Sequence, residues 1–211
     1  MTTRTAVEFD HPRDYRDEIT ARSDRIRLLA VPERRYLMVE GEGEPASQGF
    51  REAIGALYPV ACTLHFALKK RGLVAPVGSL EGLFWTEEPV PMEVAEITEP
   101  VAPVAWRWRL VLPVPAAATD ADCASAAEEV RVKKNPPLID RVRCDAWEEG
   151  PVAQILHVGP YDAERPTIER LHQAIKEKGL HPRGCHHEIY ISDPNRTKPE
   201  RLKTIIRQAV A

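Results

Sequence analysis

Hydrophobic and polar residues alternate along this chain with two different periodicities, one typical of helices and one typical of strands, and these predict its secondary structure. Apolar residues three and four positions apart predict helices over 47–71, 121–134 and 164–178. Short apolar or alternating runs predict strands over 36–41, 80–86, 105–112, 152–158, 186–192 and 202–206. The order strand, helix, strand, strand therefore occurs twice, with one further helix between the two copies.

The repeated order predicts a single domain over 1–211 with two modules, the first over about 28–113 and the second over about 120–211. We expect an α+β fold in which two β-α-β-β modules, related by a pseudo-twofold, form one antiparallel sheet with helices on one face. A further strand over 142–147 precedes a turn signal at Glu149-Gly150-Pro151, so we expect a hairpin between this strand and the one over 152–158.

The stretch 185–194 gathers polar side chains on one face of a predicted strand. Alternation places Ile189 and Ile191 on one face, and it places four polar-capable residues on the other, namely His186, Glu188, Tyr190 and Ser192. Such a face either meets water or lines a cavity. Glu81 in the strand over 80–86 holds the place that Glu188 holds in the second copy, so a pseudo-twofold would bring both to one central groove, where a ligand site would form.

Composition and charge exclude several classes of protein. The 211 residues are 43% hydrophobic and 29% charged with a net charge of -3, so no overall field recruits nucleic acid or an anionic membrane. About 30 residues precede the first strand, too few for a helix-turn-helix domain. The sequence contains no apolar run near the roughly 20 residues that span a bilayer, and its start lacks an apolar signal segment. We expect a cytoplasmic protein with no nucleic-acid or membrane partner.

The four cysteines are scattered and form no CxxC pair. Cys185, His186 and His187 are adjacent on a strand, so their side chains point apart and do not share a metal ion easily. The chain also lacks a nucleophile elbow, the spacing of a catalytic triad and a catalytic-cysteine signature. We therefore expect neither a metal nor another cofactor.

Several linked motifs resemble one family, the GyrI-like small-molecule-binding domain. Two of them are His157-Val158-Gly159-Pro160-Tyr161 and the run from His187 to Pro194. Further segments resemble a free-standing subgroup associated with cyclopropanoid hydrolysis: Val31-Pro32, 40–45, 56–60, 80–85 and Lys133-Lys134. The resemblance extends from about Phe9 to Ile206.

This resemblance implies two tandem SHS2 modules (β-α-β-β) around a hydrophobic cleft. It implies that Glu188 lies in the floor of the cleft and meets cationic or flat aromatic ligands, with aromatic residues as walls. In the hydrolase subgroup, acidic and aromatic residues of the cleft open the strained cyclopropane of DNA-alkylating compounds with water. Phe84 stands where many relatives have a tryptophan, and Trp85 lies beside it.

The chemistry of these side chains agrees with that expectation. Burial in an apolar cleft would raise the pKa of Glu188 toward the range of a general base. We assign Glu188 to activating a water, Glu81 to orienting it or to acting as a second acid or base, and Tyr190 or Tyr161 to binding the oxygen on which negative charge grows. Residues expected to bind the ligand are Tyr58, Phe84, Trp85, Trp106, Trp108, His157 and Tyr161. His157 alternatively serves as a hydrogen-bonded strand histidine next to a turn.

Two functions remain open from the sequence. The first is a hydrolase that opens cyclopropane-containing alkylating compounds in detoxification. The second is a non-catalytic multidrug-binding or sequestering protein for flat aromatic or cationic ligands. An acidic, aromatic cleft serves both, so the sequence leaves open whether the protein is an enzyme. It also leaves open the natural substrate, a monomer or a homodimer, and the order of the loop over 87–103.

Overall fold

The computed structural model describes residues 7–45, 47–86 and 106–211. Within these ranges the chain divides into two compact units. Unit 1 contains residues up to 32 together with 149–211, and unit 2 contains 33–86 and 106–148. The loop over 87–103, and residue 105 at the start of a predicted strand, lie outside the described residues.

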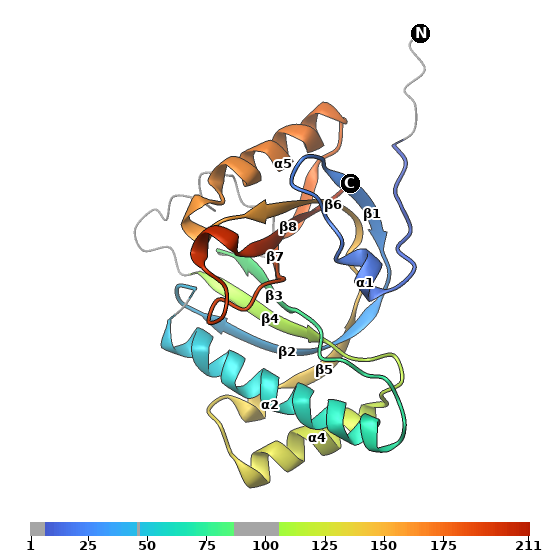
Figure 1. Cartoon of the computed structure of the whole chain (residues 1–211), viewed down its shortest axis with the longest axis vertical. Coiled ribbons are helices and arrows are strands. Elements are labelled where there is room, and N and C mark those ends of the chain that lie inside the picture. The colour runs from blue at the N-terminus through green and yellow to red at the C-terminus, as the bar shows by residue number, and fades with distance from the viewer. Residues whose placement is uncertain (1–6, 46, 87–105) are drawn as a thin grey trace. The chain divides into compact units, whose positions relative to one another are not determined.

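Unit 2 has an antiparallel sheet with strand order β3-β4-β2-β5, and its helices cover one face (Figure 1). Its elements are β2 (Arg34–Glu42), α2 (Gln48–Lys70), β3 (Leu80–Trp85), β4 (Arg107–Pro113), α4 (Asp120–Lys133), the short 3-10 helix η1 (Ile139–Arg141) and β5 (Arg143–Trp147). Phe50 of α2 packs against Phe84 and Trp108, which identifies the face of the sheet that α2 covers.

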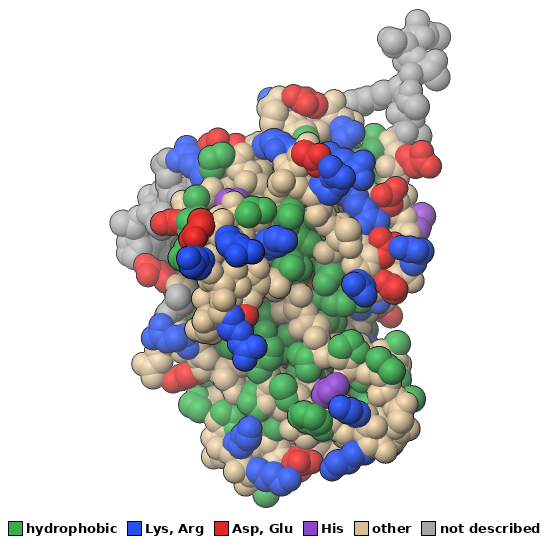
Figure 2. All heavy atoms as spheres, in the orientation of Figure 1, with side chains coloured by type: hydrophobic (Ala, Val, Ile, Leu, Met, Phe, Trp, Pro, Cys, Tyr) green, Lys and Arg blue, Asp and Glu red, His purple; other side chains and the backbone are tan. Residues whose placement is uncertain are grey.

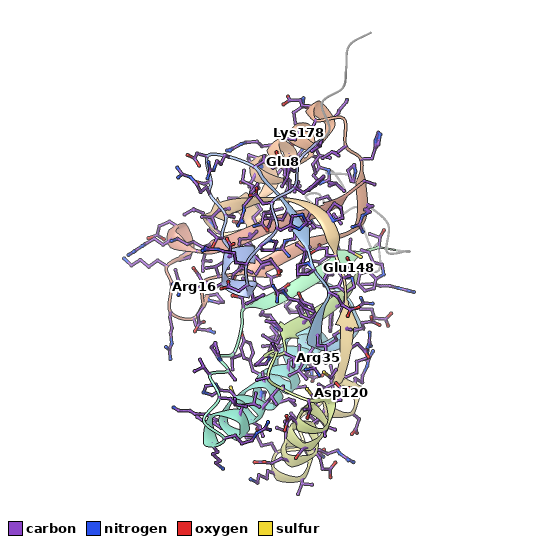
Figure 3. All side chains as sticks on the ribbon, turned by 90° about the vertical axis from the view of Figure 1, so that its right-hand side faces the viewer. Glu8, Arg16, Arg35, Asp120, Glu148 and Lys178 are labelled. Atoms are coloured by element: carbon purple, nitrogen blue, oxygen red, sulfur yellow. The ribbon has the colours of Figure 1, made fainter. Side chains whose placement is uncertain are left out.

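Two helix starts in unit 2 follow from local sequence. The Ser47 side chain accepts a hydrogen bond from the backbone N–H of Phe50 and caps α2. Thr119 and Asp122 form a capping box at the start of α4, each bonding the backbone N–H of the other. The Arg35 guanidinium donates to Asp120 in the first turn of α4 at 2.7 Å, and Figure 3 shows the two side chains together.

Unit 1 has an antiparallel sheet with strand order β1-β6-β8-β7. Its elements are α1 (Tyr15–Glu18), β1 (Arg27–Val31), β6 (Gly150–Val158), the 3-10 helix η2 (Tyr161–Ala163), α5 (Arg165–Glu177), β7 (Pro182–Tyr190), the 3-10 helix η3 (Pro199–Arg201) and β8 (Lys203–Val210). Ile168, Leu171 and Ile175 of α5 pack against Ile155 and Ile206 in the core of this unit.

The α+β class, the antiparallel pairing and the positions of the main elements are confirmed, but the expected hairpin is wrong. β5 pairs with β2, whereas β6 pairs with β1 and β8. The chain passes from one unit to the other between Trp147 and Gly150, as it does between β1 and β2 around Pro32. Each copy of the repeat therefore has one more strand than expected, in the order β-β-α-β-β. The additional first strand pairs with a strand of the other copy: β1 pairs with β6, and β5 pairs with β2.

A buried charge network joins α1 to the sheet face of unit 1 opposite α5. Arg207, Glu18 and His187 are fully buried, and Glu149 is nearly so. Arg207 Nη1 lies 3.3 Å from Glu18 Oε1 and 3.1 Å from Glu149 Oε2, and His187 Nδ1 lies 2.9 Å from Glu149 Oε1. Burial opposes the charged form of Glu149, but His187 and Arg207 outweigh it and lower its pKa to about 2.

The surface carries both signs of charge. On the face in view in Figure 2, basic and acidic side chains are interspersed, and no large field of one sign is visible. Among the described helices, none has the length and apolar character needed to cross a bilayer.

Candidate functional site

The polar face of β7 lies on the same side of the unit 1 sheet as α5. Glu188 pairs with Ile206, and Tyr190 pairs with Thr204 on β8. Paired residues of antiparallel strands share a face, and Ile206 packs against α5. A bulge between Arg183 and His186 shifts the register of β7, and Gly184 at φ 64° supplies the left-handed backbone within it. The polar face predicted from the sequence therefore lies within unit 1, on its helix-covered side.

His186 and Glu188 form a hydrogen-bonded pair on this face. His186 Nε2 lies 3.2 Å from Glu188 Oε1, and the histidine is 1% exposed. The Glu188 side chain is 16% exposed, so it is mostly buried but still reaches solvent. A buried carboxylate with one side open can meet both a histidine and a bound molecule.

Glu164, immediately before α5, brings a second carboxyl to Glu188. It occupies the N-cap position of α5, yet its side chain makes no capping bond, and the residue is 4% exposed. Its carboxyl lies close enough to that of Glu188 for a hydrogen bond between the two groups, and for their negative charges to repel each other when both are ionised. The N-cap position of α5 therefore places an acid against β7.

The two carboxyls have opposite pKa shifts. Burial and the neighbouring charge of Glu188 raise the pKa of Glu164 to about 9. Burial also works against ionised Glu188, but the bond from His186 outweighs it, with help from Tyr190 and Glu164, and its pKa is lowered. Near neutral pH, Glu164 is therefore protonated and Glu188 ionised, as in a pair of carboxyls that shares one proton.

This result corrects the expectation that burial raises the pKa of Glu188. Burial does act in that direction, but hydrogen-bond donors surround the carboxylate and reverse the sign. The carboxyl whose pKa is raised is Glu164, which the sequence did not single out.

Two tyrosine rings stand beside the carboxyl pair. The rings of Tyr161 and Tyr190 meet edge to face with centroids 5.8 Å apart at an interplanar angle of 84°. Burial and the charge of Glu188 raise the pKa of both phenols, so both keep their protons at neutral pH. Tyr161 is 41% exposed, which leaves part of its ring open to a ligand.

Two buried oxygen atoms beside the pair, Glu164 Oε1 and Thr204 Oγ1, make no well-formed hydrogen bond to another described residue, although the Thr204 hydroxyl lies near enough to the Glu164 carboxyl to act against the rise in its pKa. Thr204 is 1% exposed and pairs with Tyr190. Buried polar atoms normally have partners, and exceptions gather at functional sites. These two oxygens can bond a molecule that enters beside Glu188.

His157 supports the turn that precedes α5. Its Nε2 lies 3.2 Å from the carbonyl oxygen of Pro160, and its Nδ1 lies 3.0 Å from Oγ1 of Thr167 in α5. A carbonyl only accepts, so Nε2 donates to it. Gly159 between them has φ 145°, and an added Cβ would lie 3.1 Å from the imidazole. Both ring nitrogens have protein partners, and a ligand contact by His157 stays a prediction.

Glu81 does not hold the position in unit 2 that Glu188 holds in unit 1. Phe84 lies on the α2 side of β3, and Glu81, three residues earlier, points to the opposite face. Glu188, by contrast, lies on the helix-covered face of its sheet. The predicted equivalence of the two glutamates is therefore wrong. Glu81 is fully buried, and its catalytic role stays a prediction.

The aromatic residues expected to bind a ligand in unit 2 divide between the two sheet faces. Phe84 and Trp108 are buried under α2 with Phe50, and Trp106 meets Phe84 edge to face at 6.4 Å. Trp85 points to the other face of β3, and the half-buried Tyr58 lies on α2. Their contact with a ligand stays a prediction.

Comparisons with known proteins identify the family. A model of the GyrI-like small molecule binding domain matches residues 123–209. The structure of an uncharacterized conserved protein from Listeria innocua is 30% identical with a TM-score of 0.82, over 93% of this chain and 97% of that chain. Two structures of a hydrolase from Listeria innocua are also 30% identical, with TM-scores of 0.75 and 0.76, over 93% of this chain and 96% of theirs. No curated protein matches the sequence.

The chain therefore belongs to the GyrI-like family and carries a small-molecule-binding domain. This family is the one that the motifs around His157 and Glu188 resemble.

Proposed function

We propose that the protein is a hydrolase that adds water across the strained cyclopropane of cyclopropanoid DNA-alkylating compounds. The observation that carries the proposal is the carboxyl pair, in which Glu188 is ionised and Glu164 protonated near neutral pH. Such a pair offers a base and an acid side by side at the same pH.

The proposed reaction uses one water and leaves the protein unchanged. Glu188 accepts a proton from the water. At the same time the water oxygen attacks a cyclopropane carbon, and the strained carbon–carbon bond breaks. The electron pair of that bond moves through the conjugated ring to the ligand's carbonyl oxygen, and this oxygen takes the proton of Glu164. A proton then passes from Glu188 to Glu164 through the bond between them, which restores both groups.

Tyr161 assists at the oxygen where charge develops. Its phenol is protonated at neutral pH and can donate to that oxygen as its charge grows, whereas the single O–H of Tyr190 donates to Glu188 and keeps that carboxylate ionised. Donors in a buried site stabilise such charge more than water does. His186 acts as a positioning residue, because its bond fixes one oxygen of Glu188 at 3.2 Å.

Similarity to a protein described as a hydrolase, at 30% identity over most of both chains, supports a hydrolytic activity. The proposal that the bond broken belongs to a cyclopropane is based on the resemblance of the sequence motifs to the cyclopropanoid-hydrolase subgroup. Detoxification of such compounds would be the biological role.

One observation favours a second function, the binding of flat cationic compounds without chemistry. An ionised Glu188 next to the partly exposed ring of Tyr161 attracts a cation through charge and through the ring face. In that case Glu164 would stay protonated and would only complete the hydrogen bonds of Glu188.

Incubation of the purified protein with a cyclopropanoid alkylator, followed by mass spectrometry, distinguishes the two functions. The hydrolase predicts a product heavier than the substrate by one water, formed over many turnovers by the wild type and far more slowly by Glu188→Gln. Stoichiometric binding with product no faster than in buffer would refute catalysis and would leave the binding function.

A further inference from the structure

Two cysteines far apart in the sequence meet in unit 2, away from the carboxyl pair. Cys123 lies on α4 and Cys144 lies on β5, and their Sγ atoms are 3.3 Å apart. Cys123 is buried and Cys144 is half-buried. The helix α4 packs against β5, so the contact belongs to the core packing of the unit.

A positive charge lies beside this pair. Arg35 and Leu37 are alternate residues of β2 and share a face, and Leu37 pairs directly with Cys144. The Arg35 guanidinium is held by Asp120 at 2.7 Å and by the carbonyl of Ala118. It is therefore fixed on the sheet face that carries Cys144.

The two thiols differ in acidity. The bond from the Cys123 thiol lowers the pKa of Cys144, and the charge of Arg35 acts in the same direction. Burial and the weaker charges of Asp120 and Asp145 oppose this without reversing it. The bond to Cys144 and burial raise the pKa of Cys123. A thiolate is the reactive form of cysteine, so Cys144 is the nucleophile and Cys123 the partner.

We propose that Cys123 and Cys144 are a dithiol site that reduces hydroperoxides and closes to a disulfide. The Cys144 thiolate attacks the terminal oxygen of the hydroperoxide, the oxygen–oxygen bond breaks, and an alcohol (or water, from hydrogen peroxide) leaves with a proton. Cys144 is then a sulfenic acid. The Cys123 sulfur attacks the Cys144 sulfur, and water leaves with the Cys123 proton. Two thiols are oxidised and one hydroperoxide is reduced.

The geometry requires only a small movement. Sulfur atoms in a disulfide lie about 2.05 Å apart, so the two Sγ atoms must approach by roughly 1 Å. The bond would join residues 21 positions apart and would tie α4 to β5. This activity is independent of the proposed hydrolysis, which needs neither sulfur.

Thiol titration of the full-length protein with hydrogen peroxide tests the site, and Cys62 provides the control because it is exposed. We expect two of the four thiols to disappear, and peptide mapping to find a Cys123–Cys144 bond that a dithiol reductant reverses. Cys62→Ser should change neither result. Cys123→Ser should leave a sulfenic acid on Cys144, which a cyclic diketone traps.

If a variant fails to fold, the oxidation rates of the cysteines in the wild-type protein are sufficient to test the proposal. Loss of the Cys144 thiol at least ten times faster than that of Cys62, with the linked peptide as product, supports the site. Oxidation of Cys144 no faster than that of Cys62, or loss of thiols without the linked peptide, overturns it.

Discussion

Nε2 of His186 lies 3.2 Å from Oε1 of Glu188, and the two residues are two positions apart on the same face of β7. This bond, with donors from Tyr190 and Glu164, holds Glu188 ionised although burial works against its charge. The proton that burial would place on Glu188 lies on Glu164 instead. The proposed chemistry follows from this division of roles.

Glu188→Gln should lower turnover of a cyclopropanoid substrate by about 100-fold or more, because general base catalysis typically contributes 10²–10⁴-fold. Glu169→Gln on α5 is a matched control, since Glu169 is about half exposed and pairs only with Arg165 among the described residues. The control should keep the wild-type rate. Equal rates for Glu188→Gln and wild type would contradict the role of Glu188.

The pH dependence of turnover should identify the acid. Wild-type activity should fall as pH rises through about 9, because Glu164 then loses its proton. Glu164→Gln should lower the rate and remove this alkaline limb, because glutamine does not titrate in this range. An alkaline limb that persists unchanged in Glu164→Gln would assign it to another group.

Glu164→Gln should also stabilise the protein at alkaline pH. The pKa of Glu164 in the folded protein, about 9, lies above its ordinary value of 4.5. The contribution of Glu164 to the free energy of unfolding is fully present below pH 4.5 and is lost as the pH rises toward 9. Glutamine resembles the protonated acid and avoids this loss. Denaturant unfolding at pH 8 should therefore show a higher midpoint for the variant, and the difference should shrink toward pH 5; the opposite trend would contradict a raised pKa.

The stabilisation provided by Glu149 depends on pH in the opposite direction, and it is lost at acid pH. Its pKa in the folded protein, about 2, lies below the ordinary 4.5, so its stabilisation is present above pH 4.5 and is lost as pH falls toward 2. The shift corresponds to a free energy of unfolding on the order of 3 kcal/mol. Glu149→Gln should be less stable at pH 7 and should lose less stability between pH 5 and 2.5. Parallel pH curves for variant and wild type, measured by denaturant unfolding, would contradict the pairing with Arg207 and His187.

Gly41 and Gly55 provide a matched pair in unit 2. A Cβ at Gly41 would overlap the ring of Trp108, whereas one at Gly55 in α2 would meet nothing within 4 Å. Gly41→Ala should destabilise by roughly 1–3 kcal/mol, as overpacking does. Gly55→Ala should stabilise by about 1 kcal/mol through helix propensity. Thermal unfolding measures both, and a neutral Gly41→Ala would show that Trp108 can move.

The elements were predictable from the sequence because their signals are local. The apolar stripe of α2 and its Ser47 cap lie within one stretch of chain, as do the alternating residues of β4. Strand partners are not local. Only two residues separate β5 from β6, as in a hairpin, yet β5 pairs with β2, because its partner is chosen by tertiary packing.

The site was predictable only in part for the same reason. Glu188 and Tyr190 follow from the polar face of one strand. Glu164 meets Glu188 only through the packing of α5 on the sheet, 24 positions away in sequence by residue number. One local sign existed, a glutamate directly before a helix with proline in its first turn. The sequence predicts only that a helix over 164–178 begins at this glutamate, and the structure shows that its side chain is buried and makes no capping bond.

The division of protonation between Glu188 and Glu164 is tested most directly by NMR titration of protein labelled with ¹³C in the glutamate carboxyl groups. Signals are assigned by their loss in Glu188→Gln and in Glu164→Gln. We predict that the Glu164 signal titrates near pH 9 and that the Glu188 signal titrates below the ordinary 4.5. Titration of both signals near 4.5 would contradict the shared proton, and with it the acid and base roles proposed for this pair.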